Sequence, residues 1–366
     1  MIGIALLGAG IFARERRPQR LTFTAEHLPA IQSNPAFSLK AIYSRSQASA
    51  SALASHAAGS LDVYYDTPAT TQAKDLAALL ARADIHAVFI ALPILAQPAV
   101  IRQALEAGKH VLSEKPVAAD LEAARGLVGW YESLGLGSNA GGKPLWAVAE
   151  NYRYIESLEY AASEVGRVGG GLATFSMTKN GMVRKGGKYF ETEWRKVPEY
   201  QGGFLLDGGV HFVAALRMLL AGAGHEIRKV AAFSGLLEEH LPPVDTVSAV
   251  AVTGEGKSGT IHISFGTEFK SGFEIEVVTT EGAVLWTPTK VRTVKRGKEE
   301  GKEEVVEKEF ASTTGVKEEA VAFGEAVGRG KVDGKQSPGE ALKDLEILQR
   351  LLESGEGGAA VREVGA

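Results

Sequence analysis

The sequence predicts an α/β protein in two parts: a doubly wound parallel sheet, and a second domain with a large open, mostly antiparallel sheet. Over about the first 115 residues, short apolar runs alternate with alanine-rich helical stretches, a pattern typical of βαβ units. After residue 150, longer runs rich in β-branched and aromatic residues alternate partly between polar and apolar side chains. Such runs favour an open antiparallel sheet.

Length, charge and cysteine content narrow the class of protein. The chain has 366 residues, which favours two domains at roughly 150 residues each. Its 40 Lys plus Arg and 44 Asp plus Glu give a formal net charge of −4, which argues against nucleic acid as a partner. The absence of cysteine excludes disulfides and Cys-ligated metal sites. No apolar run reaches the ~18 residues that span a membrane, so we expect a cytoplasmic protein without a membrane segment.

The expected first domain covers residues 1–150 and is built on buried strands. Each strand is a short apolar run, as expected for a parallel sheet that is covered on both faces. The strands are predicted at residues 2–7, 38–43, 86–92, 109–113 and 145–149, and the helices at 46–58, 75–82, 97–107 and 117–134.

The expected second domain covers residues 151–366. Its strands are predicted at residues 168–178, 228–238, 244–253, 259–269 and 272–287, and the charged run 290–309 is predicted to form a solvated hairpin. Ser337, Pro338 and Glu340 form a capping-box pattern that predicts a last helix over about 338–354. The final ten residues are predicted to form a loose tail.

A glycine-rich motif follows the first strand directly and indicates a dinucleotide site. In this GxGxxA motif, Gly8 permits a tight turn and Gly10 lets a pyrophosphate approach the backbone. Ile11 and Phe12 stand where a helix usually begins, and the amides and dipole of a helix N-terminus favour phosphate. An arginine-rich insertion at 14–24 separates the motif from the next helix and departs from the usual spacing.

The residues at the end of the second strand are expected to determine whether the site prefers NAD or NADP. NAD sites normally place Asp or Glu there to bind the ribose 2′-hydroxyl, whereas this sequence has Ser44, Arg45 and Ser46. A guanidinium and two hydroxyls suit a 2′-phosphate, so we predict NADP as the preferred cofactor, with NAD as the alternative. In the other interpretation of these residues, Ser44 or Ser46 only caps the next helix.

Further motifs extend along nearly the whole chain. They are Ala91-Leu92-Pro93, Glu114-Lys115-Pro116, Asn151-Tyr152-Arg153 and Asp207-Gly208-Gly209-Val210-His211. Together with GxGxxA, they resemble the motifs of the glucose-fructose oxidoreductase / inositol dehydrogenase / rhizopine catabolism (GFO/IDH/MocA) family. The resemblance implies an N-terminal Rossmann domain, a C-terminal domain with a large open sheet, and a final helix that packs back on the first domain. It also implies NAD(P)-dependent oxidation or reduction of a hydroxyl or carbonyl, usually on a sugar, polyol or derivative.

By the same match, Lys115, Asp207 and His211 would form the catalytic group. Histidine is the side chain best suited to take a hydroxyl proton near neutral pH as a carbonyl forms. Asp207 lies four residues before His211, on the same face of a helix, where it would orient the imidazole or bind the substrate. Lys115 would polarise the carbonyl oxygen or relay a proton. The alternatives are a core histidine, a helix-capping aspartate and a surface lysine.

Other residues are candidates for contact with the cofactor or the substrate. The expected cofactor contacts include Leu92, Pro93, Gln97 and Glu114, and the candidates for the substrate pocket are Tyr154, Lys188, Tyr189, Trp194 and Arg195. Two positions depart from the family. Ala214 stands where many members have Asp, and Gln97 stands where many have a His near the nicotinamide. No metal site is predicted.

We therefore predict an NADP-dependent oxidoreductase that transfers hydride between nicotinamide and a hydroxyl or carbonyl carbon of a sugar, polyol or small carbonyl compound. The alternative is a non-catalytic, dinucleotide-sensing regulatory protein, since the family includes a galactose-regulon repressor in yeasts. A pure sensor has no reason to keep the lysine, aspartate and histidine, so their presence favours the enzyme. A bilin-type reductase stays open as a third interpretation. The resemblance also implies a homodimer or homotetramer formed through the C-terminal sheet, because that face would otherwise expose apolar surface.

Overall fold

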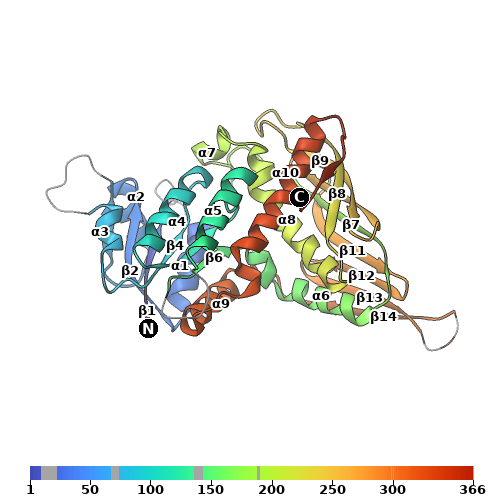
Figure 1. The fold of residues 1–366 in the computed structure, drawn as a ribbon, viewed down its shortest axis with the longest axis horizontal. Coiled ribbons are helices and arrows are strands. Elements are labelled where there is room, and N and C mark those ends of the chain that lie inside the picture. Colours follow the sequence, from blue (N-terminus) through green and yellow to red (C-terminus); the bar gives the residue numbers. More distant parts are fainter. Residues whose placement is uncertain are drawn as a thin grey trace. The chain divides into compact units, whose positions relative to one another are not determined.

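The computed structural model describes residues 1–9, 23–66, 74–135, 143–187, 190–297, 299 and 301–365, and Figure 1 shows their fold. The chain forms two compact units. The first unit contains residues 1–150, 186–194 and 316–342, and the second contains 151–185, 195–315 and 343–366.

The first unit is built on a six-stranded sheet in the order β3-β2-β1-β4-β5-β6, and all neighbouring strands are parallel. Its strands are β1 (Ile2–Leu7), β2 (Phe37–Ser44), β3 (Asp62–Tyr65), β4 (Ala87–Ile90), β5 (His110–Glu114) and β6 (Trp146–Ala149). This confirms the predicted doubly wound parallel sheet and adds β3, which the sequence did not predict. The strand order reverses between β1 and β4, and ligands of such sheets bind beyond the carboxyl ends of the strands at this reversal.

Both faces of the parallel sheet are buried. Leu6 on one face packs into a cluster with Phe89 of β4 and Phe323 of a distant helix, while Leu7 on the other face is also fully buried. The helices are α1 (Phe23–Ser33), α2 (Gln47–Ala54), α3 (Leu76–Leu80), α4 (Gln97–Glu106), α5 (Leu121–Ser133) and α9 (Val316–Arg329), with the 3-10 helices η2 (Ile94–Ala96) and η4 (Gly334–Gln336).

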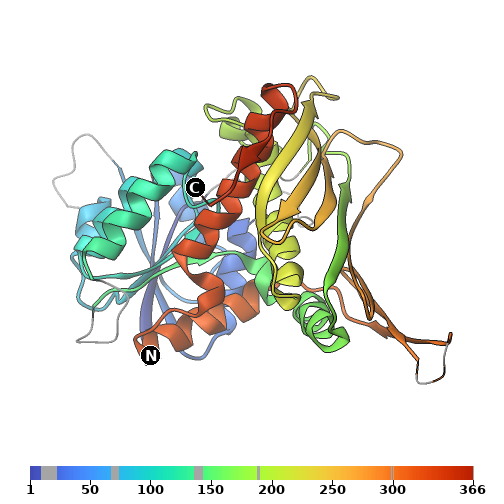
Figure 2. The same ribbon diagram turned by 45° about the vertical axis from the view of Figure 1, so that its right-hand side comes forward.

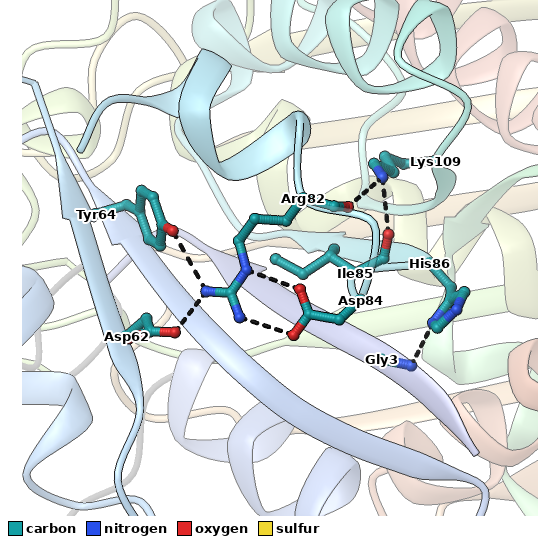
Figure 3. A network of polar contacts seen from close by, with 8 residues as sticks. All are labelled: Gly3, Asp62, Tyr64, Arg82, Asp84, Ile85, His86 and Lys109. Carbon is teal, nitrogen blue, oxygen red and sulfur yellow. Dashed lines mark hydrogen bonds and ion pairs between the residues drawn. The ribbon is translucent and has the colours of Figure 1, made fainter. Parts of the chain in front are cut away.

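The amino-terminal edge of this sheet carries a polar network (Figure 3). The Arg82 guanidinium donates to both carboxylate oxygens of Asp84, at 2.9 and 2.8 Å. The Lys109 ammonium donates to the carbonyl oxygens of Arg82 and Ile85, at 2.7 and 2.8 Å. Each buried or half-buried charge in this network therefore has a partner within the unit, which is how buried polar groups are usually satisfied.

The second unit is built on a nine-stranded sheet in the order β14-β13-β12-β11-β7-β10-β9-β8-β15. Its strands are β7 (Leu172–Asn180), β8 (Ile227–Gly235), β9 (Thr246–Thr253), β10 (Ser258–Ser264), β11 (Gly272–Thr279), β12 (Gly282–Thr287), β13 (Lys290–Arg296), β14 (Glu303–Glu309) and β15 (Arg362–Glu363). Only the pair β7 and β10 is parallel, which confirms the predicted mostly antiparallel sheet.

Three details of this sheet bear on the sequence predictions. The run 290–309 forms the expected hairpin, as β13 and β14. The run 272–287 is two strands instead of one, because residues 280–281 turn between β11 and β12. The prediction of a loose tail is wrong at Arg362 and Glu363, which pair with β8 and so extend the sheet by one short strand.

Two long helices cover one face of the large sheet, as both ribbon views show (Figures 1 and 2). The helices of the second unit are α6 (Glu156–Val168) and α8 (Gly203–Gly222), with the 3-10 helix η3 (Asn151–Tyr154) before them. The short α7 (Glu193–Lys196) and the long α10 (Pro338–Glu356) are divided between the two units. By length and composition α8 resembles a membrane span, but 78% of its most apolar window is buried inside the protein, as in a core helix.

The C-terminal segment is shared between the units in a way that differs from the expected division at residue 150. Helix α9 belongs to the first unit, because its apolar face fills the core beside β1 and β4. Residues 343–356 of α10 belong to the second unit, where Asp344 is buried and pairs with Arg153 and Arg217. Only the first turn of α10, which the Ser337 hydroxyl caps by accepting the Glu340 amide at 3.2 Å, belongs to the first unit.

Candidate functional site

The first cofactor segment lies at the carboxyl end of β1, where the strand order reverses. Gly8 adopts a φ of +119°, which L side chains rarely adopt, and a Cβ there would lie 2.2 Å from the Ala91 carbonyl oxygen. Glycine is therefore required at this turn. The other residues predicted for the motif, Gly10, Ile11 and Phe12, lie outside the described residues.

The second segment, at the end of β2, holds the residues predicted to choose the cofactor. Ser46 is the N-cap of α2, because its hydroxyl accepts the Ser49 amide at 3.2 Å, so the capping interpretation is correct for this serine. Ser44 is half-buried and Arg45 is exposed. Asp66, which no sequence pattern indicated, follows β3 and accepts a hydrogen bond of 2.8 Å from the Tyr43 hydroxyl.

Asp66 places a carboxylate beside the end of β2. Burial first, and then the hydrogen bond and charge of Asp66, raise the pKa of Tyr43 well above its ordinary value, while Arg45 acts in the opposite direction. Because both Asp66 and Arg45 affect Tyr43 electrostatically, a negative and a positive side chain share this corner of the sheet. Sequence spacing could not reveal this pairing, since Asp66 follows a different strand, β3.

The third segment follows β4. Leu92 and Pro93 are half-buried, and Gln97 begins α4 with only 1% of its surface exposed. Within the described part of the chain, neither the amide nitrogen nor the amide oxygen of Gln97 has a hydrogen-bond partner. A buried amide that lacks partners costs free energy, so this position fits a site that a bound polar group completes.

The fourth segment ends β5 with Glu114 and continues with Lys115. Lys115 is buried, with 5% of its surface exposed, so it is not the surface lysine of the alternative interpretation. Glu114 is held on both sides. Its Oε1 lies 2.6 Å from Nε2 of His27 in α1, and its Oε2 accepts the backbone amide of Lys115 at 3.2 Å. No sequence pattern pointed to His27, which the α1 helix brings to the motif from 87 residues away.

Asp207 and His211 lie on α8 in the second unit, and both are buried. Asp207 is not the N-cap of this helix, since Gly202 holds that position, so the capping alternative is wrong. The Arg195 Nε donates to Asp207 Oδ2 at 2.8 Å, and both side chains are only 6% exposed. Burial and the nearby Asp207 charge raise the pKa of Tyr200, which places a neutral hydroxyl in the same charged environment.

The imidazole of His211 has a defined orientation. Its ring stacks on the ring of Tyr152 in η3, with centroids 4.8 Å apart and planes inclined by 20°. Tyr154, two residues further along η3, is buried, and Ala214 is fully buried. Trp194 groups with the first unit, whereas Tyr152, Tyr154 and Arg195 group with the second. The candidates Lys188 and Tyr189 lie outside the described residues.

The arrangement contains the elements of an oxidoreductase site. In the first unit, four loops at the carboxyl edge of one sheet bring together a crowded glycine turn, an unsatisfied amide and a buried lysine. In the second unit, one helix presents a carboxylate held by arginine and an imidazole held by tyrosine. Among the described residues, no group of three His, Asp or Glu side chains is placed to hold a metal ion.

Comparison with known proteins identifies two matching family models. The first, an oxidoreductase family with an NAD-binding Rossmann fold, matches residues 2–136. The second, the GFO/IDH/MocA C-terminal domain, matches residues 161–285.

Several known proteins are similar over nearly the whole chain. Dehydrogenase FPY6 of Fusarium mangiferae is 50% identical over 97% of this chain and 96% of that protein. D-xylose 1-dehydrogenase (NADP(+)) 2 of Haloferax volcanii is 27% identical over 91% of this chain and 94% of that protein. The crystal structure of an oxidoreductase from Thermotoga maritima is 27% identical and has a TM-score of 0.79, with 99% of this chain and 98% of that chain covered.

Proposed function

Because this chain belongs to the GFO/IDH/MocA family of NAD(P)-dependent oxidoreductases, we propose that it transfers hydride between NADP and a hydroxyl or carbonyl carbon of a sugar, polyol or small carbonyl compound. The observation that carries the proposal is the buried Lys115, positioned beside the His27–Glu114 pair at the carboxyl edge of the Rossmann sheet. The xylose dehydrogenase of Haloferax volcanii, which is named for NADP, supports the substrate class and the cofactor.

The residues at the carboxyl edge of the sheet fit a dinucleotide. Gly8 lets the backbone turn tightly against the Ala91 carbonyl oxygen, where a Cβ would collide, and Gln97 offers a buried amide without a partner among the described residues. Ser44 and Arg45 would hold the ribose end, and Leu92, Pro93 and Glu114 would line the nicotinamide end. When bound, the nicotinamide ring supplies the carbon that accepts or donates the hydride.

The protein's own residues would handle the proton and the developing charge. The Lys115 ammonium would donate a hydrogen bond to the reacting oxygen and stabilise negative charge on it. His211 would take the hydroxyl proton during oxidation and return it during reduction. Asp207, held by Arg195, would bind a substrate hydroxyl next to the reacting carbon, with Tyr154 and Trp194 as further candidates for substrate contact.

The test is a screen of aldoses, polyols and small carbonyl compounds that follows NADPH absorbance in both reaction directions. We expect saturable turnover with at least one compound, and its loss in Lys115→Ala. If the protein binds NADPH tightly but turns over no compound in the screen, the proposal fails and the dinucleotide-sensing alternative gains support.

The cofactor preference needs its own measurement, because Asp66 opposes the predicted role of Arg45. A carboxylate near a 2′-phosphate weakens NADP binding, and a guanidinium strengthens it. We expect a lower KM for NADP than for NAD, and Arg45→Ala should raise the KM for NADP about tenfold while leaving that for NAD unchanged. Asp66→Asn should shift the ratio towards NADP. A lower KM for NAD in the unchanged protein contradicts this assignment.

We also propose that the chain forms a homodimer or homotetramer in the cytoplasm through the face of the large sheet opposite α6 and α8. Phe233 of β8 is 69% exposed and Val250 of β9 is 49% exposed, and strand alternation places both on this face. Light scattering of the purified chain tests this. A monomer at micromolar concentration would rule it out, and Phe233→Asp should dissociate an oligomer.

A further inference from the structure

Lys179 lies near the end of β7 and points towards the helix-covered face of the large sheet. It follows Phe175 and Met177 at every second position, and these two side chains are buried on that face. The Lys179 ammonium lies 5.6 Å from the ring centroid of Phe212, which belongs to α8. The side chain is therefore half-buried against a core helix and is not on the solvent face of the sheet.

The ammonium of Lys179 has no carboxylate partner among the described residues. Its one polar contact there is a long one, 3.4 Å to the carbonyl oxygen of the neighbouring Asn180. Burial lowers the pKa of Lys179, and no charged group of the described chain offsets this effect. A half-buried lysine that lacks a carboxylate partner in the described part of the chain is unfavourable for folding, so its position calls for another explanation.

Lys109 in the first unit shows how the ammonium group of a buried, structural lysine is supplied with hydrogen-bond acceptors. Burial also lowers the pKa of Lys109, but its ammonium donates to the carbonyl oxygens of Arg82 and Ile85 at 2.7 and 2.8 Å (Figure 3). Lys179 instead faces aromatic carbon. The contrast indicates that, among the described residues, the Lys179 ammonium keeps donors that a ligand could use.

The surroundings of Lys179 connect it to the proposed catalytic histidine. An aromatic cluster is formed by Tyr152, Phe212 and Phe273, whose ring centroids lie 4.8 to 6.2 Å apart. Lys179 lies against Phe212 of this cluster and pairs with Phe273 across the sheet. His211 stacks on Tyr152 of the same cluster and adjoins Phe212 on α8. One cluster of rings therefore supports both the imidazole and the unpaired ammonium.

We propose that Lys179 binds an anionic group, a carboxylate or a phosphate, on the substrate whose hydroxyl or carbonyl is converted beside His211. This inference rests on the proposed function, because it takes α8 as a wall of the substrate site. The ammonium supplies a point charge with three donors, and either anion satisfies it by a charge-assisted hydrogen bond. The substrate is then an acidic sugar, a sugar phosphate or a related hydroxy acid, in place of a neutral aldose.

The test compares acidic compounds with their neutral counterparts. Binding to the full chain with saturating NADP is measured by calorimetry for D-glucuronate and D-glucose, for D-galacturonate and D-galactose, and for D-glucose 6-phosphate and D-glucose. We expect at least one acidic member to bind about tenfold or more tightly than its neutral counterpart, the ratio of one charge-assisted hydrogen bond. The uronates and the phosphate distinguish the two anions.

Three variants assign the preference to this side chain. Lys179→Met should reduce the ratio of affinities to about one, and Lys179→Arg should keep most of it. Lys257→Met, at an exposed turn of the same unit, should leave it unchanged. Equal binding of acidic and neutral members in the unchanged protein, or a ratio that survives Lys179→Met, would overturn the proposal.

Thermal unfolding supplies a readout that does not depend on turnover. Methionine keeps the contact with Phe212 but removes the unpaired charge, so Lys179→Met should keep or raise the midpoint of the ligand-free chain. A fall of several degrees would assign Lys179 to the fold and overturn the proposal. Turnover of neutral compounds alone would also refute the anion site while leaving the proposed oxidoreductase function intact.

Discussion

The two edges of the parallel sheet differ in whether their buried polar groups have hydrogen-bond partners within the described chain. At the amino edge, Arg82, Asp84 and Lys109 form hydrogen bonds with one another or with backbone carbonyls (Figure 3). At the carboxyl edge, Gln97 buries an amide that lacks partners among the described residues, and Gly8 lets the backbone turn where a Cβ would collide with the Ala91 carbonyl oxygen. The first edge is complete as folded, whereas the second is completed by a ligand. Changes at the two edges should therefore separate stability from activity.

The largest effect is expected at the carboxyl edge. Lys115→Ala should lower kcat by about 10²–10⁴-fold, because the reacting oxygen loses its charged donor. The dissociation constant for NADPH, measured by fluorescence, should change little. Turnover close to that of the unchanged protein would remove Lys115 from the proposed mechanism.

Lys109→Met is the matched change at the amino edge. It removes the donor from two carbonyl oxygens and should cost about 1–3 kcal/mol of unfolding free energy, seen as a lower thermal midpoint. The kcat at saturating substrate should stay the same, because this edge is opposite the site. A loss of activity without a loss of stability would contradict the division between the edges.

His27 joins the fold to the proposed chemistry, so its effect should be intermediate. His27→Leu removes the contact to Glu114 and loosens the start of the Lys115 segment. We expect kcat to fall about tenfold with little change in KM, which corresponds to one misplaced charged hydrogen bond. His27→Gln, which can still donate to Glu114, should recover part of the loss. An equal loss in both variants would mean that His27 serves only packing.

The smallest effect is expected from acid titration at the amino edge. The hydrogen bonds from Arg82 lower the pKa of Asp84, so its carboxylate stabilises the fold above the ordinary carboxyl pKa of about 4, and this contribution is lost as pH falls through the lowered value. Asp84→Asn should cost less than about 1 kcal/mol at pH 7, because the Asp84 carboxylate is exposed to solvent. Urea unfolding at pH 7 and at about pH 3 should show this difference shrinking in acid. If the difference in unfolding free energy between the unchanged protein and Asp84→Asn grew in acid, the predicted stabilisation by the Asp84 carboxylate would be wrong.

Sequence patterns predicted the fold where a single element carried its own signal. The apolar run of β1 was located at its correct ends, since a strand buried on both faces needs only apolar residues. Helix α1 was missed because the insertion precedes it and Pro29 lies inside it. Strand β3 was missed because its four residues are half-exposed, and β15 because two residues carry no periodicity.

The site was predictable as a set of motifs but not as a set of contacts. Lys115, Asp207 and His211 followed from family motifs, and all three are buried. Arg195 and Tyr152, which contact Asp207 and His211, come from other elements, as does His27, which contacts Glu114 beside Lys115, so no local spacing could assign these residues. Lys179 looked like an ordinary strand residue in the sequence, because its lack of a partner is a property of the tertiary structure.

Helix α9 has a consequence for the order in which the protein is made. Phe323 of this helix contacts Phe89, which in turn contacts Phe37, with ring centroids 5.5 and 5.7 Å apart. When residue 150 leaves the ribosome, the nucleotide-binding unit still lacks this part of its core. Its aromatic surface stays open to aggregation until residues 316–342 have been synthesised. A fragment cut at residue 150 should therefore be insoluble. A soluble form of the first unit must include residues 316–342 as well as residues 1–150.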